Sequence, residues 1–207
     1  MDRAEALARL KLLIGCDLVD LGVKSGITIR KGDSIKLNKG WAGQTIERHL
    51  GLALNSSRFP NFGSWELKQV SLKAGPHGTF KVKETMAITM IDPVEVAAKE
   101  FPDSHLFLKL QRMLVVARVW ESHAETRSLC HHVAEFDLGD QELHDQIKAD
   151  YDLVRDVIRT KGFNHLSGSM GVLVQPRTKG PGHGSTSRAF YARSRLVAKI
   201  LGIGSQD

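Results

Sequence analysis

The sequence predicts one mixed α/β domain over residues 1–207, in which a mixed β-sheet is flanked by helices. Apolar side chains recur every three or four residues in several segments, which is the pattern of amphipathic helices. Other segments are short, continuous apolar runs bounded by turn residues, which is the pattern of strands. Neither an internal repeat nor a long linker divides the chain, so both kinds of element are expected to share one fold.

Apolar periodicity and capping residues locate the helices. Asp17 and Asp140 each precede a periodic segment and are of the type that caps helix N-termini. The segment after Asp140 is the most regular and continues to Gly162, a residue type that ends helices. Helices are therefore expected over residues 3–14, 17–22, 41–52, 140–162 and 193–201.

Strands are expected over residues 65–72, 79–89, 112–120 and 170–174. The first two are separated by a Gly- and Pro-containing turn at residues 74–78. The third is almost entirely aliphatic, which suits a strand that is buried on both faces. Polar segments rich in Gly, Pro, Ser or Asn predict loops at residues 31–40, 55–64 and 176–187.

Composition narrows the classes of protein. Hydrophobic residues make up 42% of the chain, enough for a buried core, and no apolar stretch is long enough to span a membrane. The N-terminal segment does not have the pattern of a secretory signal. Cys16 and Cys130 are far apart and form no C-x-x-C pair, so both are expected to be structural thiols in a reducing, cytoplasmic location.

Charge is distributed unevenly along the chain, whose formal net charge is +6. From residue 171 to the end, six Lys and Arg residues stand against Asp207 alone, whereas residues 140–156 are predominantly acidic. A basic face is what a protein presents to a polyanion such as DNA. The acidic helix is expected to be a solvated outer face, with a docking surface for a partner protein as the alternative.

The chemistry is expected at Glu66 and Lys68. Side chains alternate along a strand, so these two project from one face while Trp65 and Leu67 project from the other. Metal-dependent hydrolysis of a phosphodiester needs oxygen ligands for the ion and a nearby cation. By itself Glu-x-Lys is usually an exposed charge pair. Its context favours a site, because a turn precedes it, a strand contains it and an earlier helix offers Glu47.

Several segments, in this order, resemble the MutH-like mismatch-repair endonucleases and the related type II restriction enzymes that cut at GATC. They span most of the chain: Lys39-Gly40-Trp41-Ala42-Gly43-Gln44-Thr45-Ile46-Glu47, Leu50-Gly51, Phe62-Gly63-Ser64-Trp65-Glu66-Leu67-Lys68, Lys109-Leu110-Gln111-Arg112-Met113-Leu114, Val174-Gln175-Pro176-Arg177 and Arg188-Ala189-Phe190-Tyr191. The resemblance implies a PD-(D/E)XK, restriction-endonuclease-like fold with two lobes around a DNA cleft.

The resemblance also assigns roles. Glu47 matches an active-site glutamate, Glu66 a metal ligand and Lys68 the catalytic lysine. The implied cofactor is Mg²⁺, with Mn²⁺ as a substitute, held by Glu66, residue 61 and the Leu67 carbonyl. Gln175-Pro176-Arg177 matches a base-reading turn, and Tyr191 matches an aromatic that senses adenine methylation. The residues expected to contact double-stranded DNA are Lys73, Gln175, Pro176, Arg177, Lys179, His183, Arg188, Tyr191 and Arg193.

Two departures from the family pattern bear on activity. The position of the metal-binding aspartate holds Asn61 or, with another placement of a one-residue length difference, Arg58. Asn61 is the better match because it lies between Pro60 and Phe62. Its amide oxygen can ligate Mg²⁺ but carries no negative charge, so the affinity for the metal is expected to be lower. The change from Asp is either natural or engineered. A further active-site lysine of the family is matched here by Gln111.

Two functions of different class follow. The first is a sequence-specific, Mg²⁺-dependent endonuclease of restriction or mismatch-repair type, which nicks as a monomer or cuts as a DNA-induced dimer and, in repair, has a protein partner. The alternative, based on Asn61 and Gln111, is a non-catalytic DNA-binding module derived from such a nuclease. Zinc at Cys130-His131-His132 and a Ser122–His123 catalytic pair are disfavoured by their surroundings. The loop at 177–188 lacks the P-loop order, which disfavours nucleotide hydrolysis.

Overall fold

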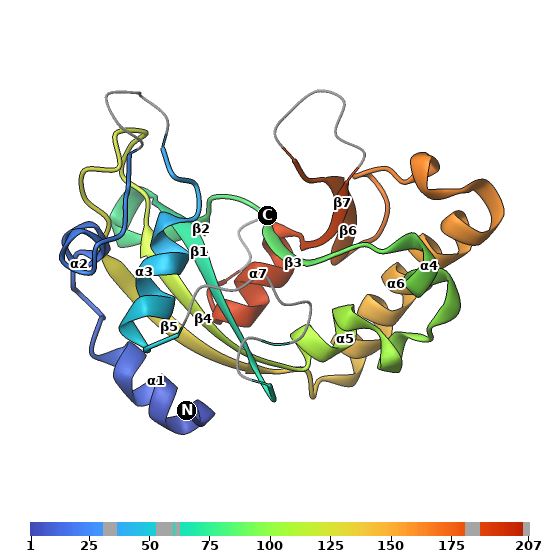
Figure 1. The fold of residues 1–207 in the computed structure, drawn as a ribbon, viewed down its shortest axis with the longest axis horizontal. Helices are drawn as coiled ribbons and strands as arrows, with labels where there is room; N and C mark the ends of the chain where they lie inside the picture. The colour runs from blue at the N-terminus through green and yellow to red at the C-terminus, as the bar shows by residue number, and fades with distance from the viewer. Residues whose placement is uncertain (31–36, 53–59, 61–62, 181–186, 205–207) are drawn as a thin grey trace.

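The computed structural model describes the whole chain except residues 31–36, 53–59, 61–62, 181–186 and 205–207. Its strands form two sheets, and its helices cover them from both sides (Figure 1). This is the mixed α/β architecture that the apolar patterns predict. The resemblance to restriction-endonuclease-like folds is confirmed at the level of the fold.

The first sheet has the strand order β2-β1-β4-β5 and is mixed. Its strands are β1 (Glu66–Ala74), β2 (Phe80–Val82), β4 (Arg112–Val119) and β5 (Cys130–Asp137). β1 runs parallel to β4, whereas β1 with β2 and β4 with β5 are antiparallel. Residues 113–118 of β4 are all buried, as its aliphatic composition predicts.

The second sheet has the order β3-β7-β6, and both of its pairings are antiparallel. Its strands are β3 (Met86–Met90), β6 (Val174–Thr178) and β7 (Arg188–Ala192). The prediction of one strand over 79–89 is wrong, because the segment divides between β2 of the first sheet and β3 of the second. The strand predicted over 170–174 instead begins at Val174 and extends into the expected loop.

Seven α-helices are described: α1 (Arg3–Lys11), α2 (Leu18–Lys24), α3 (Trp41–His49), α4 (Pro93–Ala98), α5 (His105–Leu110), α6 (Gln141–Lys161) and α7 (Ser194–Leu201). The side chains of Asp17 and Asp140 cap α2 and α6 by accepting backbone N–H groups, as predicted. Gly162, with φ of 91°, ends α6. The apolar pattern does not predict the short helices α4 and α5, because neither is long enough to show a helical period.

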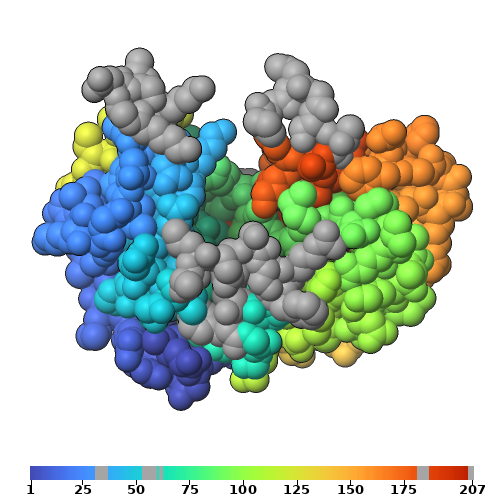
Figure 2. Space-filling model, viewed as in Figure 1, coloured from blue at the N-terminus to red at the C-terminus, as the bar shows by residue number. Residues whose placement is uncertain are grey.

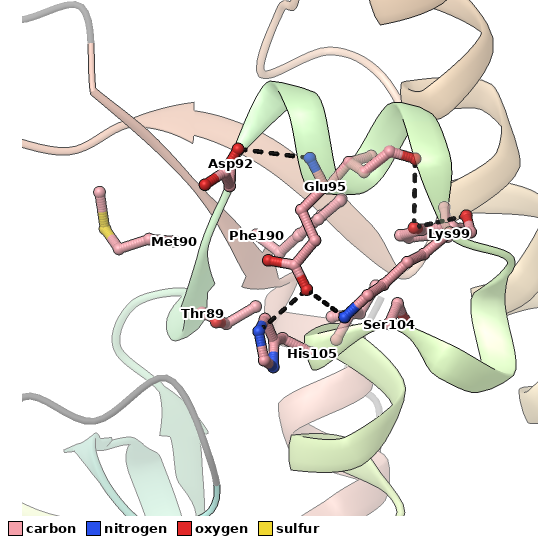
Figure 3. Close-up of a pocket in the computed structure, with 11 residues that line it drawn as sticks. Thr89, Met90, Asp92, Glu95, Lys99, Ser104, His105 and Phe190 are labelled. Atoms are coloured by element: carbon pink, nitrogen blue, oxygen red, sulfur yellow. Dashed lines mark hydrogen bonds and ion pairs between the residues drawn. The ribbon is translucent and has the colours of Figure 1, made fainter.

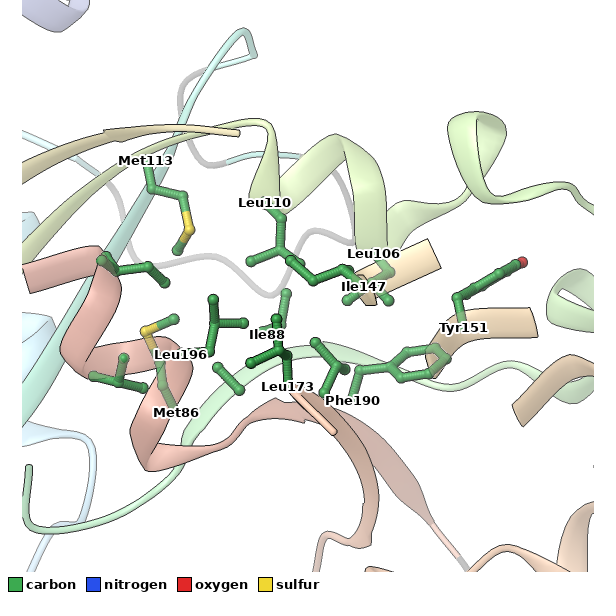
Figure 4. Packing of buried hydrophobic residues seen from close by; sticks show 14 of the residues in the cluster. Met86, Ile88, Leu106, Leu110, Met113, Ile147, Tyr151, Leu173, Phe190 and Leu196 are labelled. Carbon is green, nitrogen blue, oxygen red and sulfur yellow. The ribbon is translucent and has the colours of Figure 1, made fainter. Parts of the chain in front are cut away.

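Two apolar cores lie on opposite faces of the first sheet. Because side chains alternate along β4, Leu114 and Val116 pack with α1 and α3, whereas Met113 and Val115 pack with the second sheet, α6 and α7. Figure 4 shows part of the larger core, where side chains from α5, α6 and α7 meet those of β3 and β7. β4 is therefore the element that joins the two halves of the molecule.

The molecule has two lobes. Helices α1–α3 form one lobe and α4–α6 the other, with the first sheet extending between them (Figure 1). Figure 2 shows the surface hollowed between the lobe of α1–α3 and the strands β6 and β7. None of the described helices has the length and apolar character needed to cross a membrane.

Candidate active site

Glu66 lies at the start of β1 and is completely buried. Its Oε1 atom is 2.5 Å from Lys68 Nζ and 3.1 Å from Lys109 Nζ. The strand explains the first contact, because Leu67 packs into the core beside α1 and α3 while residues 66 and 68 project from the other face. Burial of a carboxylate is tolerated only with such partners, and two ammonium groups balance the charge of Glu66.

Lys109 contacts Glu66 and is a member of the candidate site that sequence reasoning missed. It lies in the last turn of α5, directly before β4, and is almost fully buried. The resemblance points to Gln111 as the position of an additional lysine, but Gln111 Nε2 donates to the Leu108 carbonyl at 3.4 Å. Two signals were available: a lysine within the apolar run that precedes β4, and its place at the start of the family-like segment 109–114. The local sequence thus provides the second cation two residues earlier than expected.

Glu47 reaches the same place from α3. Burial raises the pKa of its carboxyl, the Lys68 ammonium lowers it and the Glu66 carboxylate raises it further. The charges of both residues act on Glu47, so Glu47 lies within their electrostatic reach. The three residues that were assigned to catalysis and that the structure describes are therefore brought together.

Lys179 is the residue that directly follows β6, on the opposite side of the hollow from α3. Partial burial lowers the pKa of its ammonium, and the charge of Lys68 lowers it further. Burial likewise lowers the pKa of Lys109. The Glu66 carboxylate raises this pKa, whereas the charges of Lys68 and Lys179 lower it further. Lys179 was expected as a DNA contact and lies within electrostatic reach of the carboxylate cluster. The site is therefore built from both sides of the hollow.

The donor set fits a hard divalent cation. The Glu66 carboxylate is the kind of oxygen ligand that such a cation prefers, and a bound cation would relieve the repulsion that Glu66 exerts on Glu47. The third expected side-chain ligand, Asn61, lies outside the described residues, as does the alternative Arg58. Within the described part of the chain, no group of three His, Cys, Asp or Glu residues has metal-binding geometry. A metal here would need the Leu67 carbonyl and residue 61 as well.

The expected base-reading residues lie on the paired strands β6 and β7. Arg177 is exposed, donates from Nη1 to Thr85 Oγ1 at 2.7 Å, and lies over the Tyr191 ring at 5.5 Å. Gln175 pairs with Tyr191 in register but is only 5% exposed. Pro176 is also buried. Arg177 and Tyr191 are therefore the members of this group with surface available to a ligand.

The other expected DNA contacts differ in their surroundings. The Lys73 ammonium lies over the Trp120 ring at 5.2 Å, and the Arg188 guanidinium lies over Phe163 at 5.8 Å. His183 lies outside the described residues. Arg193 donates to the carbonyls of Gly168, Met170 and Gly171, at distances of 2.9 to 3.1 Å, and so also supports the backbone.

A buried aspartate completes the support of β6. Asp150 of α6 accepts hydrogen bonds from the backbone N–H groups of Val172, Leu173 and Val174, at 2.6 to 2.7 Å. These N–H groups are therefore unavailable to a sheet, which explains why the predicted strand at 170–174 begins late. Asp150 on one side and Arg193 on the other fix the segment that leads into Gln175-Pro176-Arg177.

A second polar cluster lies away from this site, between β3, α4, α5 and α6. Glu95 contacts Lys99 at 2.7 Å and His105 at 2.9 Å (Figure 3). The cavity beside them encloses only about 10 Å³, room for roughly one water molecule. The cluster joins α4 to α5 and offers no space for a substrate.

Comparison with known proteins agrees with this geometry. The family model described as DNA mismatch repair enzyme MutH matches residues 50–150, the stretch that contains Glu66, Lys68 and Lys109. The DNA mismatch repair protein MutH of Vibrio campbellii is 25% identical over 219 residues, covering 96% of this chain and 92% of that protein. The protein of the same name from Shewanella sp. strain MR-4 is 27% identical over 215 residues, covering 96% and 93%. Together, the fold, the arrangement of the site and these matches show that nearly the whole chain is similar to DNA mismatch repair proteins named MutH.

Proposed function

We propose that this protein is a sequence-specific, Mg²⁺-dependent endonuclease acting on double-stranded DNA, with Mn²⁺ as a substitute metal. The observation that carries the proposal is the buried Glu66 carboxylate held between Lys68 and Lys109, with Glu47 beside it. Relatives of matching length are named DNA mismatch repair proteins, which supports DNA as the substrate. We propose that the two lobes form one functional domain. We also propose a cytoplasmic location, in keeping with free Cys16 and Cys130.

Each residue has a role that follows from its position. Glu66, the Leu67 carbonyl and residue 61 would hold the metal, which when bound supplies Lewis-acid activation of the phosphodiester and of water. Lys68 is placed to orient the attacking water and to stabilise negative charge on the phosphate. Lys109 would pair with the buried Glu66 carboxylate and hold it in place, and Glu47 is available to accept a proton from the water.

Sequence recognition is assigned to the second sheet. Arg177 presents a guanidinium beside Tyr191, and arginine pairs with the O6 and N7 atoms of guanine in the major groove. Lys179 and Arg188 are placed to hold backbone phosphates. GATC is not carried over as the target, because the position of the family's first arginine holds Gln175, which is buried.

The test is cleavage of supercoiled plasmids that contain GATC and other short sites, in Mg²⁺ and in Mn²⁺. The unaltered chain should cut slowly and Asn61→Asp should cut faster, because an added carboxylate strengthens metal binding. Glu66→Gln in the Asn61→Asp background is the matched control and should be inactive. Absence of metal-dependent cleavage by Asn61→Asp in either metal would overturn the proposal.

The second candidate is a non-catalytic DNA-binding module, and the amide at position 61 is the observation that favours it. It predicts salt-dependent duplex binding without cleavage, even after Asp is restored. Oligomeric state separates the remaining forms of the first proposal. Sedimentation with and without duplex distinguishes a monomer that nicks one strand from a DNA-induced dimer that cuts both, and addition of a repair partner would be needed for full activity in the repair form.

A further inference from the structure

Trp120 lies between two lysines at the end of the first sheet. The Lys73 ammonium is 5.2 Å and the Lys83 ammonium 4.8 Å from the centre of its indole ring. Both distances are within the range of cation–π attraction. The His123 ring packs edge-on against the same indole, with ring centres 5.1 Å apart. Two flexible side chains are therefore held with their charges close together instead of moving freely.

The sheet register explains why these residues meet. Lys73 pairs with Lys81, Ser71 pairs with Arg118, and the Lys83 N–H donates to the Ser71 carbonyl. Because side chains alternate along strands, positions 73, 83 and 120 lie on one face. The arrangement is thus a property of the β1, β2 and β4 backbones.

The surface beside Trp120 is hollowed and is positive in balance. A cavity of about 250 Å³ is lined by Lys39, Lys83, Glu84, Arg118, Trp120 and His123, together with Leu37 and Glu125. Arg118 and Glu125 form a buried two-point ion pair at 2.7 and 3.0 Å and so neutralise each other. Glu84 is 3.9 Å from Lys83, a loose and exposed contact. Lys39 and Lys73 add to the positive charge around the ring.

This surface is connected along the chain to the residues assigned to base reading. Arg177 of the second sheet donates to Thr85, which is only two residues from Lys83 in the connection between β2 and β3. A polyanion that contacts Arg177 would therefore also lie near the segment that contains Lys83, whose ammonium lies over Trp120. The positive charge, the strand register and the connection to Arg177 all favour a DNA backbone as the ligand of this surface.

We propose that Lys73, Lys83 and Trp120 form a second DNA contact that holds backbone phosphates outside the bases read at Arg177, with Trp120 positioning the two ammonium groups. The inference rests on the proposed function, since it requires that the chain binds duplex DNA. It assigns to this surface the salt-dependent, sequence-independent part of binding, which phosphate contacts supply.

The test is titration of a fluorescently labelled duplex at several salt concentrations, without divalent metal so that no cleavage occurs. Lys73→Ala/Lys83→Ala should weaken binding at 0.1 M salt by about tenfold or more and lower the salt slope by roughly two, because each lysine that no longer neutralises a phosphate lowers it by about one. Lys11→Ala/Lys148→Ala, on α1 and α6, makes the same change in net charge away from the surface and should leave the slope unchanged.

A second pair of variants tests the indole. Trp120→Ala should weaken binding, and Trp120→Phe should retain most of it, because a phenyl ring still attracts both ammonium groups. Thermal unfolding of each variant shows whether the fold persists.

The possible failures are distinguishable. If the unaltered chain binds no duplex, the proposed function fails as well. If it binds duplex but Lys73→Ala/Lys83→Ala has the slope of the Lys11→Ala/Lys148→Ala control, this proposal alone is overturned. Equal competition by inorganic phosphate and by a short duplex at the same phosphate concentration would also overturn it, since the surface would then bind free anions and not a DNA backbone.

Discussion

Lys109 Nζ lies 3.1 Å from Glu66 Oε1, so the last turn of α5 reaches the buried carboxylate at the start of β1. Replacing this lysine by methionine removes the buried positive charge that pairs with Glu66. We expect Lys109→Met to lower single-turnover cleavage by about 10²–10³-fold, the range typical when one electrostatic partner is removed from an active site. Binding of duplex without metal should change much less.

Gln111→Leu is the matched control, because Gln111 lies two residues further along the chain and its side chain donates to the Leu108 carbonyl. It should cleave within a fewfold of the unaltered protein. Both measurements are made in the Asn61→Asp background. A greater decrease in cleavage from Gln111→Leu than from Lys109→Met would contradict the assignment of the second cation.

The sequence predicted the geometry of this cluster where that geometry depends on local spacing. Glu66 and Lys68 are two residues apart on one strand, and strand alternation suffices to place them on one face. Lys109 is 43 positions away from Glu66, and its contact depends on the parallel pairing of β1 with β4. No periodicity within either segment encodes that pairing.

The fold shows the same division between local and long-range information. Helix α6 was predicted closely, because its period, its Asp140 cap and its Gly162 stop all lie within the segment. The division of residues 79–89 between two sheets was not predicted. Both β2 and β3 have strand-like composition, and the strands with which they pair lie elsewhere in the chain. The late start of β6 depends on Asp150, which is more than 20 residues earlier in the chain.

Glu47 is expected to decrease stability while serving activity. Burial raises the pKa of its carboxyl above the ordinary value of 4.5, so the folded state disfavours the ionised form. Below pH 4.5 the group is protonated in both the folded and unfolded states and the penalty is absent. The penalty develops as the pH rises through the raised pKa and is complete above it.

Glu47→Gln should therefore have a higher unfolding midpoint than the unaltered chain at pH 7, and this advantage should disappear as the pH falls toward 4.5. Cleavage should fall by about 10²-fold, as expected for the loss of a general base. Thermal unfolding from pH 4 to 8 and single-turnover cleavage at pH 7 are the measurements. The quantity to compare is the difference in unfolding midpoint between Glu47→Gln and the unaltered chain. If this difference favours the variant less at pH 7 than at pH 4.5, Glu47 is not desolvated.

Asp150 is expected to matter for both stability and recognition. Its two oxygens accept three backbone N–H groups, whereas asparagine has one acceptor oxygen and would present an N–H₂ group to buried donors. Asp150→Asn should lower the free energy of unfolding by about 2–4 kcal/mol. Asp152→Asn, on the same helix but in ion pairs at the surface, should change it by less than about 1 kcal/mol. Urea unfolding of the two variants distinguishes them, and equal decreases would contradict the anchoring role.

Gly171 is expected to be the least replaceable glycine that leads into the recognition strand. Its φ is 76°, and a Cβ at this position would lie 1.9 Å from the Val174 carbonyl oxygen and 3.2 Å from the Asp150 carboxyl carbon. Gly202 has a similar φ of 64° but has open space where a Cβ would lie. Gly202→Ala should therefore lower the free energy of unfolding by only about 1 kcal/mol, the strain of the left-handed conformation itself. Gly171→Ala should lower it by more than about 3 kcal/mol, because the backbone that Asp150 holds must also move.

The comparison of these two glycine variants tests whether the segment before β6 is rigid. Thermal unfolding should separate their midpoints by roughly 5–10 °C, since about 1 kcal/mol corresponds to 2–4 °C in a protein of this size. Similar midpoints would mean that the segment before Gln175 adapts freely. The proposal that Arg177 reads bases from a fixed position would then have to be abandoned.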